Sequence, residues 1–207
     1  RTLNNKKISI SSILNNIKPI LCISIIVLSA YTGYKGIDYY SLYFYEILNY
    51  SKEKSALVIT NLSYLRPISA ILAGIIADKI SSKLSSLIMF VLLMISYSCL
   101  SFINLGNDIN FLLFFNFIVS MVAVFAMRGI FYSLLKETNI PINITGISVG
   151  IISLIGYLPD VYVGPIFGYF LDQNNGLESF QSCFLFLLAI TTLGLLASLY
   201  TPKKKYN

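Results

Sequence analysis

The sequence predicts an all-α membrane protein of six membrane-spanning helices. The chain is 56% hydrophobic, only 12% charged, and has a mean hydropathy of +0.75. A soluble domain carries about 25% charged residues. Six apolar segments each reach the roughly 20 residues that cross a bilayer as a helix. They are too long for barrel strands and lack a two-residue alternation, so helices are favoured.

These segments divide the chain into three regions. A basic leader over residues 1–16 precedes a six-helix bundle over residues 17–203, and a short basic tail follows over residues 204–207. The connections are short and contain turn residues. The six predicted spans cover residues 17–46, 55–77, 84–103, 111–135, 144–171 and 180–200.

The first span is longer than the bilayer, so it must tilt, kink or protrude. It is rich in tyrosine and interrupted by glycines, a pattern typical of transporter sites. One helix face carries four side chains that we expect to line a substrate cavity: Tyr31, Tyr34, Lys35 and Asp38. An i,i+3 pair in which Lys35 neutralises Asp38 is an equally weighted alternative. The outer tyrosines are expected to form an interfacial belt: Tyr39, Tyr40, Tyr43 and Tyr45.

The second span contains Arg66, twelve positions from both Lys54 and Asp78. At about 1.5 Å per residue, this places the guanidinium roughly 18 Å from either end. A charge at that depth costs about 2.5–3.5 kcal/mol and therefore marks a functional site or a buried ion pair. Its planar fork suits a carboxylate, a phosphate, a nitrate or sugar hydroxyls. The alternative is a structural pair with Asp38 or Asp160, and Pro67 is expected to kink the helix.

The third and sixth spans have no charged residue, whereas the fourth and fifth have one each away from their ends. Arg128 lies eight residues before Lys136 and thus in the cytoplasmic half of its span. Asp160 is a candidate proton-coupling carboxylate, with ion pairing to an arginine as the alternative. The three positive and two negative charges inside the spans weakly favour an anionic or strongly polar solute. Paired glycines in the fifth span, Gly146–Gly150 and Gly164–Gly168, predict close helix contact.

Several functional classes fit the composition poorly. The chain has no histidine, and its three cysteines lie inside apolar runs without metal-ligand spacing. We therefore expect no cofactor, no metal site and no enzymatic activity. The basic residues gather at the ends of apolar runs, so no nucleic-acid partner is expected in spite of the net charge of +6.

Charge in the connections predicts the orientation. With the N-terminus inside, the inner segments contain ten basic residues, and the outer connections contain Lys52 and Lys54 alone. This asymmetry predicts that both termini are cytoplasmic. The abundance of Asn, Lys and Ile suggests an AT-rich genome and hence a bacterial inner membrane. The lipid bilayer is the expected partner on the outer surface.

Residues 74–83, Gly-Ile-Ile-Ala-Asp-Lys-Ile-Ser-Ser-Lys, join the second and third spans. This segment resembles the cytoplasmic loop signature of the major facilitator superfamily, roughly G-x-x-A-D-R/K-x-G-R/K-R/K. Five positions match: Gly74, Ala77, Asp78, Lys79 and Lys83. Ser81 replaces the second glycine and Ser82 replaces a basic residue, departures that fit the degenerate second copy of the motif.

The resemblance implies the C-terminal half of a twelve-helix transporter, helices 7–12, with the leader corresponding to the central cytoplasmic loop. The expected partner is then an N-terminal six-helix half of the same chain, or a second copy of this half. Asp78 is expected to help hold one gating state. The fourth span would be the tenth family helix, so a gate contact between Arg128 and Asp78 is favoured over substrate binding by Arg128.

The function that follows from these features is secondary active transport of a small polar or anionic solute by alternating access, with proton coupling left open. Because Arg1 is not an initiator methionine, we expect a fragment of a longer protein. The alternatives are a non-transporting scaffold or regulatory subunit, and a homodimer of half-transporters. An intramembrane enzyme ranks last.

Overall fold

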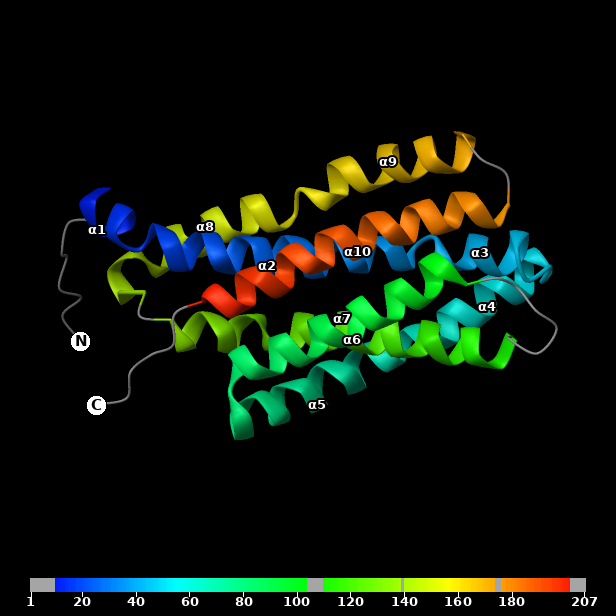
Figure 1. Ribbon diagram of the computed structural model, residues 1–207. Helices are drawn as coiled ribbons and strands as arrows, with labels where there is room; N and C mark the ends of the chain where they lie inside the picture. The colour runs from blue at the N-terminus through cyan, green and yellow to red at the C-terminus, as the bar shows by residue number, and fades with distance from the viewer. Residues whose placement is uncertain (1–9, 104–109, 139, 174–175, 202–207) are drawn as a thin grey trace.

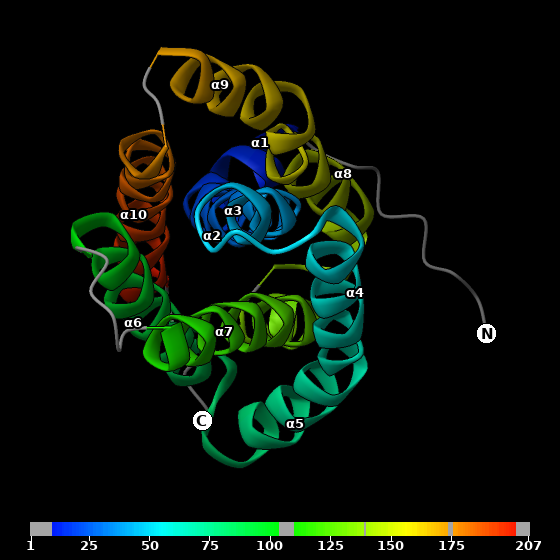
Figure 2. The same cartoon turned by 90° about the vertical axis from the view of Figure 1, so that its right-hand side faces the viewer.

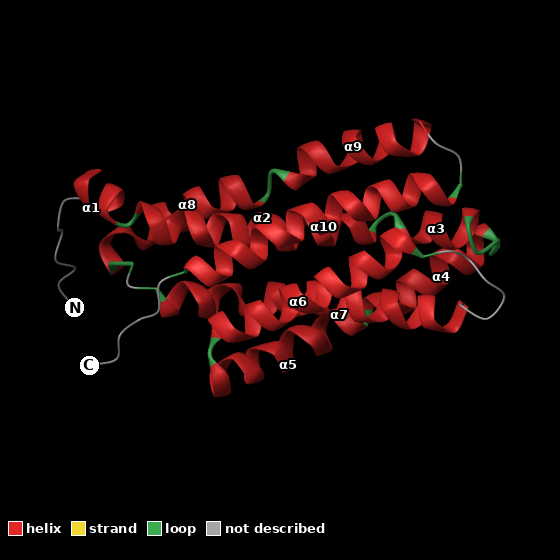
Figure 3. Cartoon of the chain, in the orientation of Figure 1, coloured by secondary structure: helices red, strands yellow, loops and turns green. Residues whose placement is uncertain are grey.

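The computed structural model describes residues 10–103, 110–138, 140–173 and 176–201. Within these ranges the chain is helical and contains no strand (Figure 3). The first nine residues of the predicted leader and residues 202–207 of the basic C-terminus lie outside them. The helices are α1 (Ile10–Asn15), α2 (Ile17–Ile37), α3 (Tyr40–Glu46), α4 (Lys52–Ser63), α5 (Leu65–Ile80), α6 (Ser82–Phe102), α7 (Asn110–Glu137), the 3-10 turn η1 (Ile142–Ile144), α8 (Thr145–Gly156), α9 (Pro159–Gln173) and α10 (Leu177–Tyr200).

Six helical segments are long and apolar enough to cross a membrane, which confirms the predicted all-α membrane class with six spans. Each predicted end lies within three residues of the observed one. The observed spans are Ile17–Glu46, Lys52–Ile80, Ser82–Phe102, Phe111–Glu137, Ile142–Gln173 and Leu177–Tyr200. The chain is thus an integral membrane protein whose apolar outer surface contacts the bilayer.

The first span, α2 and α3, runs through the centre of the bundle (Figure 2). Helices α6 and α10 lie on one side of it, and α4, α5 and α8 lie on the other. Helix α2 packs against α7, α8 and α10, whereas α5 packs mainly against α7. In the most apolar stretch of the second span only 11% of the residues are buried, compared with 61% in that of the first. Helices α4 and α5 therefore expose most of their surface at one side of the bundle. Figure 1 shows α1 and the end of α10 at the same end of the molecule.

An aromatic core surrounds α3. Tyr40 and Tyr43 are 1% and 0% exposed, and both rings pack against Phe117, at centroid distances of 4.6 and 5.1 Å. The hydroxyl of Tyr40 shares a 2.9 Å hydrogen bond with Ser120. The expected interfacial belt is therefore wrong for these two tyrosines. Because α3 lies inside the bundle, its tyrosines fill the core instead of facing the headgroups.

Proline positions explain the breaks in two spans. The second span is interrupted at Tyr64, between α4 and α5. Pro67 has no N–H to donate to the carbonyl of Ser63, and its ring crowds the preceding turn. The kink expected at Pro67 is thus present, one turn earlier in the chain. Pro159 opens α9 in the same way after the break that follows Gly156.

The first span is broken between Ile37 and Tyr40 without a proline (Figure 3). Here the backbone N–H groups of Asp38 and Tyr39 bond three residues back, to the carbonyls of Lys35 at 3.3 Å and Gly36 at 3.1 Å. The tighter i→i+3 pattern ends α2 and separates it from α3. The first span is therefore an interrupted helix.

The glycine contacts differ from those predicted. A Cβ added at Gly146, Gly150 or Gly168 would meet nothing within 4 Å, so the expected close approach at the paired glycines of the fifth span is wrong within this chain. These residues lie on faces of α8 and α9 that the bundle leaves open. Close approaches occur instead at Gly156, where a Cβ would lie 2.5 Å from the side chain of Val27 on α2, and at Gly129 on α7, where it would lie 2.5 Å from the backbone oxygen of Ala70 on α5.

Charged side chains satisfy two helix ends where α5 turns into α6. The carboxylate of Glu137 accepts hydrogen bonds from the backbone N–H groups of Ser82 at 2.5 Å and Lys83 at 3.2 Å. The ammonium of Lys83 donates to the carbonyls of Leu199 and Thr201, both at 2.7 Å. An anion thus caps the start of α6 and a cation caps the end of α10, as the helix dipoles favour. These contacts tie three spans together at one end.

Replacing Gly129 by alanine should destabilise the bundle by about 1–3 kcal/mol, because the new methyl group overlaps backbone atoms of α5 that cannot rotate away. The measurement is the free energy of unfolding in detergent micelles. Gly150→Ala is the matched control, since open space surrounds that position and alanine favours a helix. Equal stabilities of the two variants would contradict the close α5–α7 contact.

Removing the cap at the start of α6 should also weaken the fold. Glu137→Ala leaves the N–H groups of Ser82 and Lys83 without their acceptor, and we expect a loss of about 1–2 kcal/mol in the free energy of unfolding. Glu178→Ala, in the exposed first turn of α10, is the control. A loss at Glu178 as large as that at Glu137 would argue against the cap.

Candidate functional site

The five ionisable residues predicted inside the spans come together in one cluster. They come from four of the six spans, and charge-free stretches of α6 and α10 do not contribute. Three of the charged side chains form ion pairs with one another, and the other two contact the same aromatic ring. The members are Lys35 on α2, Asp38 just after α2, Arg66 on α5, Arg128 on α7 and Asp160 on α9.

The acidic part of the cluster is organised around Lys35. Its ammonium lies 3.4 Å from the carboxylate of Asp38 and 3.2 Å from that of Asp160. The hydroxyl of Tyr31 donates to Asp160 at 3.1 and 3.2 Å from the two carboxylate oxygens. The predicted i,i+3 pair is therefore formed, and a second carboxylate from α9 joins it. One cation thus bridges α2 to the fifth span.

The cationic part is organised around Tyr34. The Arg66 guanidinium carbon lies 5.2 Å from the Tyr34 ring centroid, and that of Arg128 lies 4.4 Å from the same centroid. Arg66 also lies 5.2 Å from the ring of Phe125. Among the described residues neither guanidinium has a carboxylate within 4.0 Å, so the alternative pairing of Arg66 with Asp38 or Asp160 is not formed. Within the described part of the chain, aromatic rings are the partners of both guanidinium groups.

The cluster opens onto the surface of this chain. Arg66, Arg128, Asp38 and Asp160 are exposed, and Lys35 is partly so. Tyr34 lies near the middle of the first span, so side chains that touch it are far from both ends. A hydrocarbon environment would not accept several charges at that depth. The face that carries the cluster must therefore meet water or another protein surface, not lipid.

Breaks in the helices occur beside the charges. Asp38 lies within the break of the first span, Arg66 follows the break at Tyr64 by two residues, and Asp160 is the second residue of α9. Discontinuous helices expose backbone groups, which membranes tolerate where the chain lines a polar cavity. Such breaks are a recurring feature of transporter binding sites. Three interrupted spans thus have their breaks next to residues of the charged cluster.

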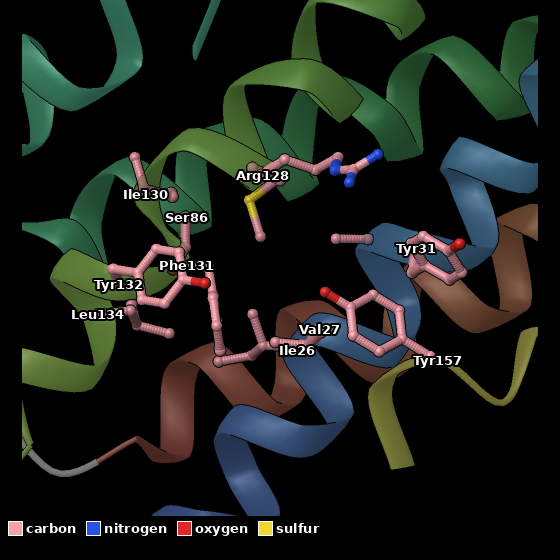
Figure 4. A pocket seen from close by; sticks show the side chains of 12 residues that line it. Ile26, Val27, Tyr31, Ser86, Arg128, Ile130, Phe131, Tyr132, Leu134 and Tyr157 are labelled. Carbon is pink, nitrogen blue, oxygen red and sulfur yellow. The ribbon is translucent and has the colours of Figure 1, made fainter. Parts of the chain in front are cut away.

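A cavity of about 160 Å³ lies next to Arg128, between α2, α7 and the end of α8. Figure 4 shows Arg128, Tyr31 and Tyr157 around it. The rings of Tyr31 and Tyr157 meet edge to face with centroids 4.8 Å apart. The rest of the wall is mainly apolar, from Val27, Met127 and their neighbours. The cavity thus has a mainly apolar lining with one cationic group at its edge.

Sequence reasoning identified seven of the nine residues that meet in this site and missed Phe125 and Tyr157. Phe125 precedes Arg128 by three positions, and Tyr157 precedes Asp160 by three. Residues at this spacing share a helix face, so aromatic partners of a charged residue are detectable from it. Tyr157 lies in the break after α8, where helical spacing no longer predicts which residues share a face. Its contact with the ring of Tyr31 is visible only in the structure.

The predicted gate contact is not formed in this conformation. Asp78 is exposed near the end of α5, and within the described ranges it has no ion pair with Arg128. Gly129 faces Ala70, eight residues before Asp78, so about 12 Å of helix separates the level of Arg128 from Asp78. Arg128 instead contacts Tyr34 and Tyr31. Gating roles for Asp78, Arg128 and Asp160 remain predictions.

Two inner membrane proteins of Escherichia coli K12 are similar to this chain. Inner membrane protein YihN is 25% identical over 214 aligned positions, which cover 97% of this chain and 50% of that protein. Inner membrane protein YqcE is 37% identical over 71 residues, or 34% of this chain and 16% of that protein. This chain thus spans about half the length of YihN. No protein-family model matches it, and no solved structure matches it significantly.

Water should reach the cluster but not the apolar surface beside it. In a cysteine-free background of the full-length protein, Arg66→Cys should react with a membrane-impermeant maleimide, because that face cannot meet lipid. Ile68→Cys is the control. Ile68 is 54% exposed on the same helix but points away from α7, so lipid should shield its thiol. Labelling of Ile68→Cys alone would contradict the polar face.

Proposed function

We propose that this chain is a six-helix half of a secondary transporter of the major facilitator type, which moves a small polar or anionic solute by alternating access. The observation that carries the proposal is the charged cluster exposed at mid-depth on one side of the bundle. Four spans contribute to it, and three of them break beside it. A second six-helix half facing this surface would enclose a polar passage and remove the charges from lipid.

Two further observations favour this family. YihN is about twice as long as this chain, as expected if a second six-helix half accompanies it. The signature-like segment occupies the turn between α5 and α6, as the resemblance requires. In that turn Ser81 has φ 157° and ψ 150°, on the edge of the region that favours glycine. The family signature has glycine at this position.

The proposed substrate site consists of Arg66 with Tyr31, Tyr34, Lys35 and Asp38. Arg66 offers five N–H donors that no described carboxylate occupies. Asp160 is the proposed coupling residue, because its pair with Lys35 joins two spans and has to open if the helices move apart. Coupling to protons, as in a symporter, would then mean that protonation of Asp160 releases this pair. Uniport and antiport are the alternative mechanisms.

We place the protein in a bacterial inner membrane, in agreement with the names of both relatives. The end that carries α1 and the end of α10 would face the cytoplasm. Lys83 and the other basic residues beside the turn from α5 to α6 lie at that end, as the positive-inside rule requires. Asp78 lies in the same region, where it would act in the closing of the cytoplasmic gate.

Uptake into proteoliposomes tests this function. The full-length protein should accumulate at least one solute from a panel of radiolabelled small organic anions and sugars. Arg66→Ala should reduce that uptake to the background of empty vesicles while membrane insertion stays unchanged. Lys54→Gln is the control: it also removes a cation that contacts a tyrosine ring, that of Tyr50, but it lies at the end of a span and should transport normally.

Failure to accumulate any solute, with a folded and inserted protein, would favour the alternative of a non-transporting scaffold or regulatory subunit. Unchanged uptake by Arg66→Ala would remove Arg66 from the substrate site but leave transport in place. If the natural protein has six spans and cross-linking joins two copies of it, the homodimer of half-transporters would be supported.

A further inference from the structure

We infer that the solute of this site is an organic monoanion whose carboxylate or similar oxyanion is attached to a compact apolar body about the size of a benzene ring. The inference rests on the proposed transport function and specifies its substrate class. It requires that Arg66 and Arg128 bind the anion together and that the cavity beside Arg128 takes the apolar body.

The two arginines share one platform. Their guanidinium carbons lie 5.2 and 4.4 Å from the centroid of the Tyr34 ring, so their separation cannot exceed the sum of these distances. At a separation of at most about 10 Å two like charges repel each other, and contact with a ring offsets only part of that cost. An oxyanion between them would relieve the repulsion and accept hydrogen bonds from both planar forks.

The other cation of the cluster is already occupied. Lys35 contacts both Asp38 and Asp160, and within the described ranges no carboxylate forms an ion pair with either arginine. The cluster as a whole contains three positive and two negative groups. A single negative charge on the solute therefore makes it formally neutral, which favours a monoanion at mid-membrane depth.

The cavity determines the shape of the rest of the solute. Its volume is about 160 Å³, and a protein cavity of about 150 Å³ lined by apolar side chains accommodates benzene. The rings of Tyr31 and Tyr157 form one wall, and aliphatic side chains such as Val27 and Ala30 form another. Arg128 lines this cavity (Figure 4). It also belongs to the guanidinium pair at Tyr34, so it connects the anion site to the apolar site. This assigns Arg128 to substrate contact, which the sequence ranked below gating.

Three probes separate the two parts of this inference: benzoate has both the charge and the ring, acetate has the charge alone, and benzyl alcohol has the ring alone. The experiment is equilibrium binding of radiolabelled benzoate to the full-length protein in nanodiscs at fixed ionic strength. Unlabelled acetate and benzyl alcohol compete in parallel. We expect benzoate to bind at least about tenfold more tightly than either competitor.

Variants of the two parts should act differently on these probes. Arg66→Gln and Arg128→Gln should each weaken benzoate by about tenfold or more and leave benzyl alcohol unchanged. Ala30→Val partly fills the cavity and should weaken benzoate but not acetate. Lys54→Gln, whose ammonium lies 4.0 Å from the ring of Tyr50, is the control and should bind all three probes normally.

The inference is overturned if acetate competes as well as benzoate, or if benzyl alcohol does. Normal benzoate binding by the double variant Arg66→Gln, Arg128→Gln would overturn it too. The proposed function fails separately. If benzoate binds in an arginine-dependent manner but vesicles accumulate no solute, transport is wrong and the anion site stands. If a neutral solute is transported equally by the wild type and the double variant, transport stands and the anion site is wrong.

Discussion

A charge inside a bilayer has to be solvated by protein or water, and this requirement organises the whole bundle. Five charged side chains lie away from the ends of the described spans, and the fold collects these five in one cluster. Helices α6 and α10, whose central stretches have no charge, lie on the other side of the central helix (Figure 2). The two spans with no charge in their central stretches thus lie across the central helix from α4 and α5.

The two parts of the cluster are satisfied to different degrees. Lys35 has two carboxylate partners, and Asp160 also receives a hydrogen bond from Tyr31. Among the described residues Arg66 and Arg128 have aromatic rings as partners, which leave their N–H donors available to other acceptors. An ion pair that joins two spans resists their separation, whereas an open pair of guanidinium groups recruits an anion. One site therefore combines a contact that holds a conformation with a contact that binds a solute.

Backbone geometry places these groups. Gly129 lets α5 and α7 approach closely, and this contact brings Arg66 and the neighbouring Arg128 to the same tyrosine. The breaks at Tyr64 and after Gly156 turn α5 and α9 so that their charged residues reach α2. The caps formed by Glu137 and Lys83 hold the other end of α6, α7 and α10 together. The position of the polar site thus depends on the close α5–α7 contact, on the caps that join α6, α7 and α10, and on three interrupted spans.

The sequence by itself determined the six spans and the members of the charged cluster, because apolar length and the cost of an unsolvated charge are local properties. It also determined the kink at Pro67, since a missing N–H acts on its own helix. Only the tertiary structure decided that Tyr40 and Tyr43 fill the core, that Gly129 and not Gly150 makes the close contact, and that Arg128 turns to Tyr34 and not to Asp78. These outcomes depend on which helix stands next to which, and residue spacing along one chain does not contain that information.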